Sequence, residues 1–345
     1  MANRTQYQER ARSILHSIVE TYIENGEPVA SRTIAEANGG QLSPATIRNI
    51  MAELYEEGYL AQPHTSAGRI PTVRAFQSYV QSLATRRLSM TDVQRLRSEL
   101  RRADSMERRL EVSSQLLTTM TNNVGIAAAI PSAAQTLAQI ELLLLADRRV
   151  LMVLETRDHR VSNRVVALDQ SVSQDELNSV RNYFNQNFAG WTLTRIQQEL
   201  RSRLDEERAT YDAMLQRLEM LQQKGLLEIG LTPEIHLDGT SNLFLIDLAM
   251  NKESLRDLFR TLEEKQRLLA LLDRFMEAAP GEIGVQVGLG ELHPSMGEFS
   301  LIGITVTLPT GLSTKFAVLG PMRMDYSQVM ASVYHIGEAV ESLSA

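Results

Sequence analysis

The side chains with the clearest chemistry lie in one segment, residues 43–71, SPATIRNIMAELYEEGYLAQPHTSAGRIP. The first half of this segment has apolar residues at helical spacing, and Arg48 and Asn49 fall outside that stripe. In the major groove of DNA, arginine pairs with guanine and asparagine with adenine through two hydrogen bonds each. A helix presenting them, with Ser43 and Thr46 on its first turn, is suited to reading base pairs. The same pattern also fits an ordinary solvated helix face.

A loop with a glycine follows this helix. Pro63, Gly68 and Pro71 exclude a continuing helix and favour a strand, a turn and a second strand. Small hydroxyls and a cation on such a turn can approach a phosphate or the minor groove closely. The alternative is a polar surface loop, but a helix and this loop in succession favour a DNA-binding wing. The candidate loop residues are His64, Thr65, Ser66 and Arg69.

The elements before this segment have the proportions of a helix-turn-helix. Apolar residues recur at helical spacing over 9–25, where an Asn-Gly pair ends the helix. A second helix is expected over 31–38, with Ser31 as its N-cap. After a Gly-Gly turn, Ser43 is the expected N-cap of the third helix, 44–57, because proline follows it at the first helical position.

Composition excludes several classes of protein. The chain has 345 residues, a net charge of −7 and no cysteine, so disulfides and thiolate metal sites are excluded. Its six histidines lie at no metal-ligand spacing, and no nucleophile or phosphate-loop motif occurs. We therefore expect no cofactor, no metal and no enzymatic activity. No apolar run approaches the length that spans a bilayer, and no signal peptide is evident, so we expect a cytoplasmic protein without a membrane segment.

The rest of the chain predicts a mixed α+β organisation. A long arginine-rich helix or helix pair is expected over 86–121, and two buried strands are expected between 138 and 169. A heptad-like seam between 204 and 221 fits either packing within one domain or a dimer contact. This layout suggests a sheet domain that contains an insertion. The other expected helices cover 174–188, 196–223, 251–279 and 326–343, and the other expected strands are IGVQVG, EFSLIGITVTLP and TKFAVLGP.

The loop GPMRMDY, residues 320–326, is the other conspicuous motif. Gly320 and Pro321 end a strand, and Arg323 and Asp325 are close enough in sequence to form an ion pair. We interpret it as a structural turn, with a ligand contact as the alternative.

These motifs resemble those of the HrcA family, the heat-inducible transcription repressors of bacteria. TIRN at 46–49 and PHTSAGRIPT at 63–72 carry the resemblance most specifically, and GPMRMDY is similar to the family's C-terminal signature. Met322 stands where a threonine is more usual, and GLGELHPSM at 288–296 departs from the family pattern.

The resemblance implies an α+β multidomain protein. Its expected parts are a winged helix-turn-helix DNA-binding domain at 1–85, then a linker helix and the first part of a GAF-like domain at 86–170. An inserted, helix-rich dimerisation domain is expected at 171–245, and the second part of the GAF-like domain at 246–345. The implied partners are a second copy of the chain, a double-stranded operator with an inverted repeat (CIRCE) and a GroEL-type chaperonin.

The implied function is repression of chaperone operons by a homodimer that heat stress releases from DNA. The competing hypothesis is a ligand-responsive regulator that senses a small molecule through its GAF-like domain. A third possibility is an adaptor whose winged helix binds protein; the lack of a catalytic constellation disfavours an enzyme.

Overall fold

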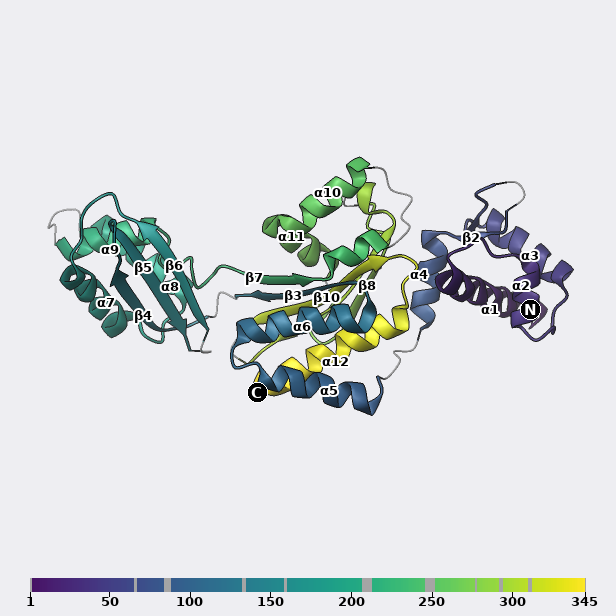
Figure 1. Cartoon of the computed structure of the whole chain (residues 1–345), viewed down its shortest axis with the longest axis horizontal. Helices are drawn as coiled ribbons and strands as arrows, with labels where there is room; N and C mark the ends of the chain where they lie inside the picture. The colour runs from purple at the N-terminus through teal and green to yellow at the C-terminus, as the bar shows by residue number, and fades with distance from the viewer. Residues whose placement is uncertain are drawn as a thin grey trace.

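The computed structural model describes residues 2–64, 67–83, 88–131, 135–157, 160–206, 213–245, 252–276, 278–291, 294–309 and 312–344. Three parts follow one another along the long axis of the molecule (Figure 1). They are a helical N-terminal unit with a two-stranded ribbon, a five-stranded sheet between helices, and a three-stranded sheet with helices of its own. All the strand pairs given by the described residues are antiparallel. The expected mixed α+β class is therefore confirmed at this level.

The N-terminal unit consists of four helices and a short ribbon. Its core is formed by apolar residues of all four helices, including Ile18, Ile34, Ile50 and Phe76. The ribbon follows the third helix directly, in the order that the sequence predicts. The elements are α1 (Ala2–Asn25), α2 (Ser31–Ala37), α3 (Pro44–Glu56), β1 (Leu60–Ala61), β2 (Ile70–Pro71) and α4 (Val73–Ser82).

The start of α2 differs from the expectation. Ala30, in an extended conformation, holds the N-cap position, and Ser31 is already the first helical residue. The reason is that Val29, one residue earlier, is held in a β-bridge with Arg69. This pairing keeps the chain extended only up to Ala30, so the helix begins at Ser31, one residue earlier than an N-cap at Ser31 predicts.

The central sheet has the strand order β7-β3-β10-β9-β8. Helices α6 and α12 pack on one of its faces, and α10 and α11 pack on the other (Figure 1). The strands are β3 (Val124–Ile130), β7 (Glu234–Asp238), β8 (Ile283–Val287), β9 (Phe299–Thr307) and β10 (Ser313–Pro321). The helices are α5 (Met90–Arg102), α6 (Met106–Thr121), α10 (Lys252–Glu263), α11 (Lys265–Phe275) and α12 (Tyr326–Ser344), with 3-10 turns η1 (Thr240–Leu245) and η2 (Pro294–Met296).

Strand β3 was not expected from the sequence. Its residues, VGIAAAI, are buried on both faces of the sheet up to Ala129, so they lack the alternation that marks a half-exposed strand. Gly125 also has no room for a side chain, because a Cβ there would lie 2.2 Å from the backbone oxygen of Ser114 in α6. This close approach of helix and strand explains the glycine. Strand β7 was missed as well.

The third part interrupts the chain between β3 and β7, which are neighbours in the central sheet (Figure 1). It has its own hydrophobic core, which runs from Leu137 to Ile229. Because one core joins residues on both sides of position 171, the expected boundary there falls inside a packed unit. The elements are β4 (Leu137–Leu144), β5 (Arg149–Thr156), β6 (Val161–Ala167), α7 (Gln174–Phe188), α8 (Leu193–Glu206) and α9 (Ala213–Gln223).

Several long predicted elements are divided in the structure. The segment 138–169 forms three strands, because Ala146–Arg149 make a tight turn with Asp147 and Arg148 at positive φ. The helix expected over 251–279 breaks at Glu264, whose backbone is extended. The helix expected over 196–223 corresponds to α8 and α9, and residues 207–212 of it lie outside the described residues, as do the side chains of Leu204, Tyr211 and Met214 in the heptad-like seam.

An ion pair between a buried arginine and a partly exposed glutamate ties the third part to the central sheet. Arg160, at the start of β6, is 5% exposed, and its Nη2 lies 3.3 Å from Glu234 Oε1 at the start of β7. The same nitrogen donates to the backbone oxygen of Thr232 at 2.7 Å. Breaking a buried pair leaves an uncompensated charge, which costs roughly 3–5 kcal/mol. This contact therefore restrains the unit at the point where its chain rejoins the sheet.

Candidate nucleic-acid interface

Helix α3 is started and oriented by a few residues. The Ser43 side chain accepts a hydrogen bond from the backbone N–H of Thr46 at 3.1 Å, and Pro44 occupies the first helical position, as predicted. Burial of four apolar side chains fixes which way the helix faces. This buried stripe consists of Ile47, Ile50, Met51 and Leu54.

The predicted base readers lie on the opposite side of α3. Thr46, Arg48 and Asn49 are exposed, as is Ser43 at the helix start. At 100° per residue, Asn49 lies near the centre of the exposed face, and Ala45 and Ala52 are its neighbours there. Small residues beside Asn49 let the helix backbone approach a flat surface closely. The structure thus brings the predicted α3 residues together on one accessible face.

One flank of α3 is held by the first helix. The Tyr7 hydroxyl of α1 donates to Glu53 Oε2 at 2.6 Å. This hydrogen bond, together with burial and the negative charge of Glu53, raises the pKa of Tyr7 to about 12. Glu53 lies on the same flank as Thr46. Sequence reasoning missed this contact because 46 residues separate its partners.

The other flank of α3 is held by the ribbon. The Arg69 guanidinium carbon lies 4.6 Å from the centre of the Tyr55 ring, a cation–π contact. Tyr55 is on the flank of α3 that also carries Arg48. The Nη1 atom of Arg69 is buried and has no hydrogen-bond partner among the described residues. Arg69 is therefore packed beside the exposed face of α3, not extended away from it.

The ribbon is anchored by its glycine and its backbone. Gly68 packs so closely that a Cβ would lie 2.5 Å from the Val29 backbone oxygen. Arg69 and Val29 exchange two backbone hydrogen bonds, at 2.8 and 2.9 Å. The glycine therefore allows the backbone around Val29 to pair with the ribbon as a third segment. The sequence pattern did not show this requirement.

The tip of the ribbon carries the remaining predicted residues. His64 is exposed, and its backbone oxygen accepts from Ala67 N at 2.9 Å. The Gln62 side chain donates to the Ala67 oxygen at 3.2 Å and helps to close the loop. Thr65 and Ser66 lie outside the described residues.

Charge is distributed unevenly along α3. Its first half carries Arg48, and its last turn and C-cap carry Glu53, Glu56 and Glu57. A polyanion therefore meets attraction at the start of the helix and repulsion at its end. The N-terminal end of the helix dipole adds to the same preference. This arrangement favours docking by the first two turns of the helix.

The loop 320–326 packs against the N-terminal unit instead of forming its own ion pair. Asp325 Oδ1 accepts from the backbone N–H of Gln328 and so caps α12, and no Arg323–Asp325 pair is present, although both residues are described. The ring of Tyr326 lies 6.2 Å from that of Phe76 in α4, and its hydroxyl is 2.9 Å from Ser300 Oγ. The expected local pair is therefore wrong, because helix capping engages the carboxylate.

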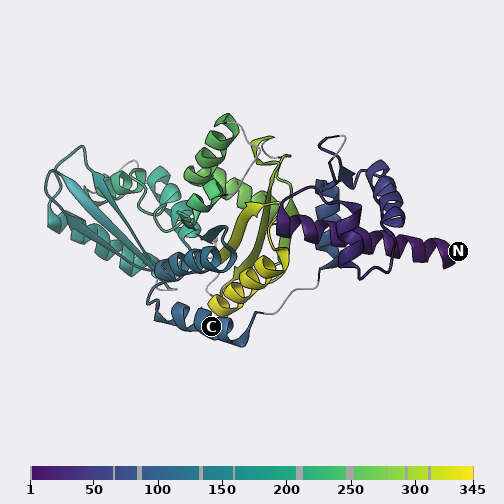
Figure 2. The ribbon, with the colours of Figure 1, turned by 45° about the vertical axis from the view of Figure 1, so that its right-hand side comes forward.

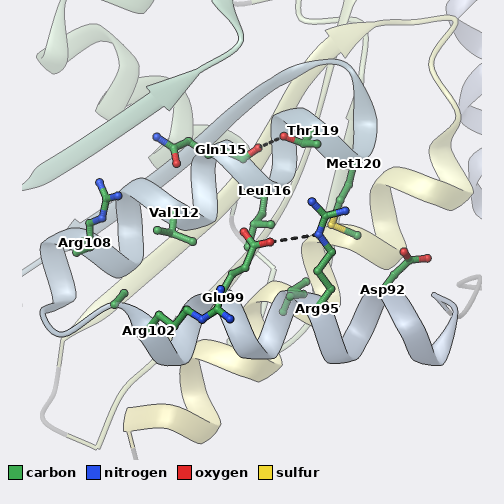
Figure 3. Close-up of a pocket in the computed structure, with 12 residues that line it drawn as sticks. Asp92, Arg95, Glu99, Arg102, Arg108, Val112, Gln115, Leu116, Thr119 and Met120 are labelled. Carbon is green, nitrogen blue, oxygen red and sulfur yellow. Dashed lines mark hydrogen bonds and ion pairs between the residues drawn. The ribbon is translucent and has the colours of Figure 1, made fainter.

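A groove of about 450 Å³ separates α5 from α6 (Figure 3). Its charged rim is largely paired: Arg95 contacts Glu99, and Arg108 contacts Glu111. Leu96 and Leu116 form part of its apolar floor. Within the described part of the chain, no group of three or more His, Asp or Glu residues could hold a metal, and no helix is long and apolar enough to cross a membrane.

A helix that exposes Arg48 and Asn49, with Arg69 of the ribbon packed at its side, defines a class of protein suited to contact nucleic acid. Comparison with known sequences is more specific: the family model "HrcA protein C terminal domain" matches residues 107–330. The chain belongs to the HrcA family. This is a family of heat-inducible transcription repressors and not of enzymes.

Named relatives match over nearly the whole chain. The heat-inducible transcription repressor HrcA of Geobacter sulfurreducens is 36% identical, and the match covers 98% of each protein. The HrcA of Sorangium cellulosum is 33% identical over 94% of each. A solved structure of a protein described only as hypothetical has a TM-score of 0.57 at 20% identity and covers 97% of this chain and 98% of its own, which shows a shared fold.

The Tyr7–Glu53 contact predicts an unusual titration. With a pKa of about 12, the Tyr7 phenol should be only about one-tenth ionised at pH 11, whereas an ordinary tyrosine is about nine-tenths ionised. In Glu53→Gln the pKa should fall toward 10, because the main cause of the shift is removed. Carbon-13 NMR of labelled tyrosine measures this, with Tyr7→Phe to assign the signal.

The sign of the linked stability effect follows from the raised pKa. The contribution of Tyr7 to folding is complete below pH 10 and is lost as the pH rises toward 12. Tyr79 serves as the control, because burial is the first cause of its raised pKa and Glu53→Gln should leave it unchanged. A Tyr7 signal that is mostly ionised at pH 11 in the unaltered protein would contradict the contact.

Proposed function

We propose that the chain represses heat-inducible genes in the cytoplasm by binding an inverted-repeat operator, and that residues 1–85 form a winged helix-turn-helix domain. The observation that carries this proposal is the exposed face of α3. Arg48 and Asn49 lie together there, on a helix held by Tyr7 on one flank and by the ribbon on the other. Preorganised side chains lose little conformational entropy on binding.

The first two turns of α3 would enter the major groove. Arg48 would contact a guanine and Asn49 an adenine, with Thr46 and Ser43 contacting bases or phosphate. The acidic end of the helix supports this polarity, because Glu53 and its neighbours would be repelled by phosphates at close range.

The ribbon would hold the DNA backbone or the minor groove. His64, Thr65 and Ser66 at its tip, and Arg69 at its base, supply a ring nitrogen, hydroxyls and a cation for such contacts. The stacking of Arg69 on Tyr55 keeps its charge beside the helix and supports a backbone role. Contacts of this kind set the position of the helix and carry little sequence information.

Arg48→Ala should relax sequence preference. Loss of one bidentate base contact costs about 1–3 kcal/mol on the cognate operator, which is roughly a 5- to 150-fold loss of discrimination. Arg69→Ala should instead weaken binding to all DNA by a similar factor. Gel-shift titrations of both variants on CIRCE-type and scrambled duplexes at fixed salt measure, for each variant, the ratio of operator affinity to scrambled-DNA affinity.

Arg101→Ala is the matched control, since Arg101 is exposed on α5, outside the proposed interface, and has no ion pair among the described residues. It should leave both affinities unchanged. If Arg48→Ala kept the full ratio of operator to scrambled binding, the assignment of Arg48 as a base reader would be wrong.

We further propose that the central sheet is the GAF-like domain and that the unit inserted between β3 and β7 is the dimerisation domain. The single core from Leu137 to Ile229 supports limits of about 131–233 for the insertion, wider than expected at its start. An inverted repeat requires a two-fold dimer, which needs a self-complementary surface.

The outer face of the insertion's sheet is a candidate for that surface. In the strand register, Leu143 of β4 pairs with Leu151 of β5, and Leu151 pairs with Val165 of β6. This row of apolar residues faces away from the core, with Val165 49% and Leu143 47% exposed. Val161, at 54%, continues the patch. Exposed apolar patches of this kind mark contact sites between proteins.

Val165→Glu should therefore shift the protein from dimer to monomer. A charge placed in an apolar interface loses hydration without gaining a partner, so the dimer dissociates at concentrations where the unaltered protein stays paired. Analytical ultracentrifugation measures the assembly state, and circular dichroism confirms folding. Gln94→Glu, on the exposed side of α5, is the control. A dimer of unchanged affinity would place the contact on another surface.

Release on heating needs no ligand in this proposal. A dimer loses operator affinity when one of its parts unfolds, because a single DNA-binding unit keeps half of the contacts, and marginal stability makes this loss steep in temperature. A GroEL-type chaperonin would restore the folded fraction. Adding chaperonin and ATP to a heat-challenged sample should raise the operator-bound fraction, and albumin at equal mass should not. An equal rise of the operator-bound fraction in both samples would show that the chaperonin has no specific role in the mechanism.

A further inference from the structure

The loop 320–326 is not used by the proposed DNA contacts, yet it lies at the junction between the N-terminal unit and the central sheet. It begins in the last two residues of β10, and Met322 N donates to the Glu298 oxygen at 2.9 Å. On its other side Arg323 lies against Gly26, where a Cβ would be 2.3 Å from the guanidinium Nη1. Gly26 has a positive φ of 71° and ends α1, so the loop meets the N-terminal unit at a helix terminus.

A cleft of about 380 Å³ opens at this junction, within the size range of small-molecule sites. One wall comes from the ribbon and α4, and the other comes from the loop. Most of the lining is apolar, and the side chains that bear polar groups are Tyr22, Thr72, Glu298 and Arg323. The apolar lining includes Ile70, Val73, Phe76 and Met322.

Arg323 is the cation of this cleft. It is half-buried, and within the described part of the chain no carboxylate lies at ion-pairing distance from it. The end of α1 beside it contributes the negative pole of a helix dipole, which is about half a charge and is shared with solvent. A guanidinium between apolar walls favours a planar anion that accepts two parallel hydrogen bonds.

Glu298 limits the charge of the occupant. It is exposed at the edge of the cleft, and its negative charge would repel a second charge on a ligand. A dicarboxylate or a phosphate is therefore disfavoured against a single carboxylate. The apolar lining would bury a hydrocarbon or an aromatic ring. We propose that the junction cleft binds a small apolar monocarboxylate, with its carboxylate on Arg323 and its apolar body against the ribbon and α4.

Such a ligand would contact both the DNA-binding unit and the central sheet. Binding would stabilise the arrangement in which the two walls are close together, by an amount set by ligand concentration relative to Kd. If a second arrangement of the N-terminal unit binds the operator with a different affinity, the ligand would change the population of that arrangement. The site would give this repressor a second input besides temperature, and it does not depend on the proposed base contacts.

Isothermal titration calorimetry of the full chain with benzoate and hexanoate tests the proposal, with benzamide and hexanamide as uncharged controls. Saturable binding of at least one carboxylate at one site per chain is expected, and its amide should bind at least tenfold more weakly. Phthalate, a dianion, should also bind more weakly than benzoate. Arg323→Gln should weaken carboxylate binding at least tenfold, whereas Arg256→Gln, on the exposed side of α10, should not.

A second variant covers the case in which Arg323→Gln unfolds. Ala61→Leu keeps the arginine and fills part of the cleft, since Ala61 lines it and is partly exposed, so it should abolish binding while circular dichroism stays unchanged. The proposal is overturned if no carboxylate binds at millimolar concentration, if the amides bind equally well, or if binding survives in Ala61→Leu.

Discussion

Burial of one apolar stripe orients the candidate interface. Each isoleucine or leucine removed from water contributes roughly 1.5–3 kcal/mol, whereas an exposed ion pair contributes about 0–1 kcal/mol. The stripe that includes Ile47, Ile50 and Leu54 therefore determines the rotation of α3, and the polar residues follow from it. Arg48 and Asn49 face outward because the buried stripe occupies the side of α3 that packs on the core.

Contacts from distant segments then hold that helix from both sides. Tyr7 reaches Glu53 from α1, and Arg69 covers Tyr55 from the ribbon. The ribbon itself depends on Gly68, which lets its backbone pair with Val29. A rigid support of this kind is what a base-reading helix needs, because a displacement of about 1 Å can disrupt a bidentate contact.

The three parts of the molecule are joined in different ways. A single hydrophobic cluster runs from the N-terminal unit into the face of the central sheet covered by α6 and α12, with Phe76 against Tyr326 at the junction. The insertion lies at the opposite end of the molecule from the N-terminal unit (Figure 2). It has a separate core and is held where its chain rejoins the sheet, by Arg160 and Glu234. A change at the junction loop is therefore transmitted to the N-terminal unit through packed side chains, whereas the insertion, among the described residues, shares no hydrophobic core with the rest of the molecule.

The sequence by itself determined the local elements and the family. Ser43 and Pro44 predicted the start of α3, the 3.6-residue period predicted its buried stripe, and PHTSAGRIPT with GPMRMDY carried the resemblance that the full-length relatives confirm. These signals are local, since caps and periodicity depend on neighbouring residues. Strand β3 was missed because its residues are buried on both faces of the sheet and show no alternation. Ser31 is not the N-cap of α2, because the pairing of Val29 with Arg69, 40 residues away, leaves the extended Ala30 at that position.

Only the tertiary structure decided what lies beside what. It set the packing of Arg69 on Tyr55, the start of the inserted unit's core near Leu137, and the cleft that Arg323 lines. Each of these features brings together residues that lie far apart in the chain. Such choices are settled by the packing of whole elements, which no short window of sequence contains.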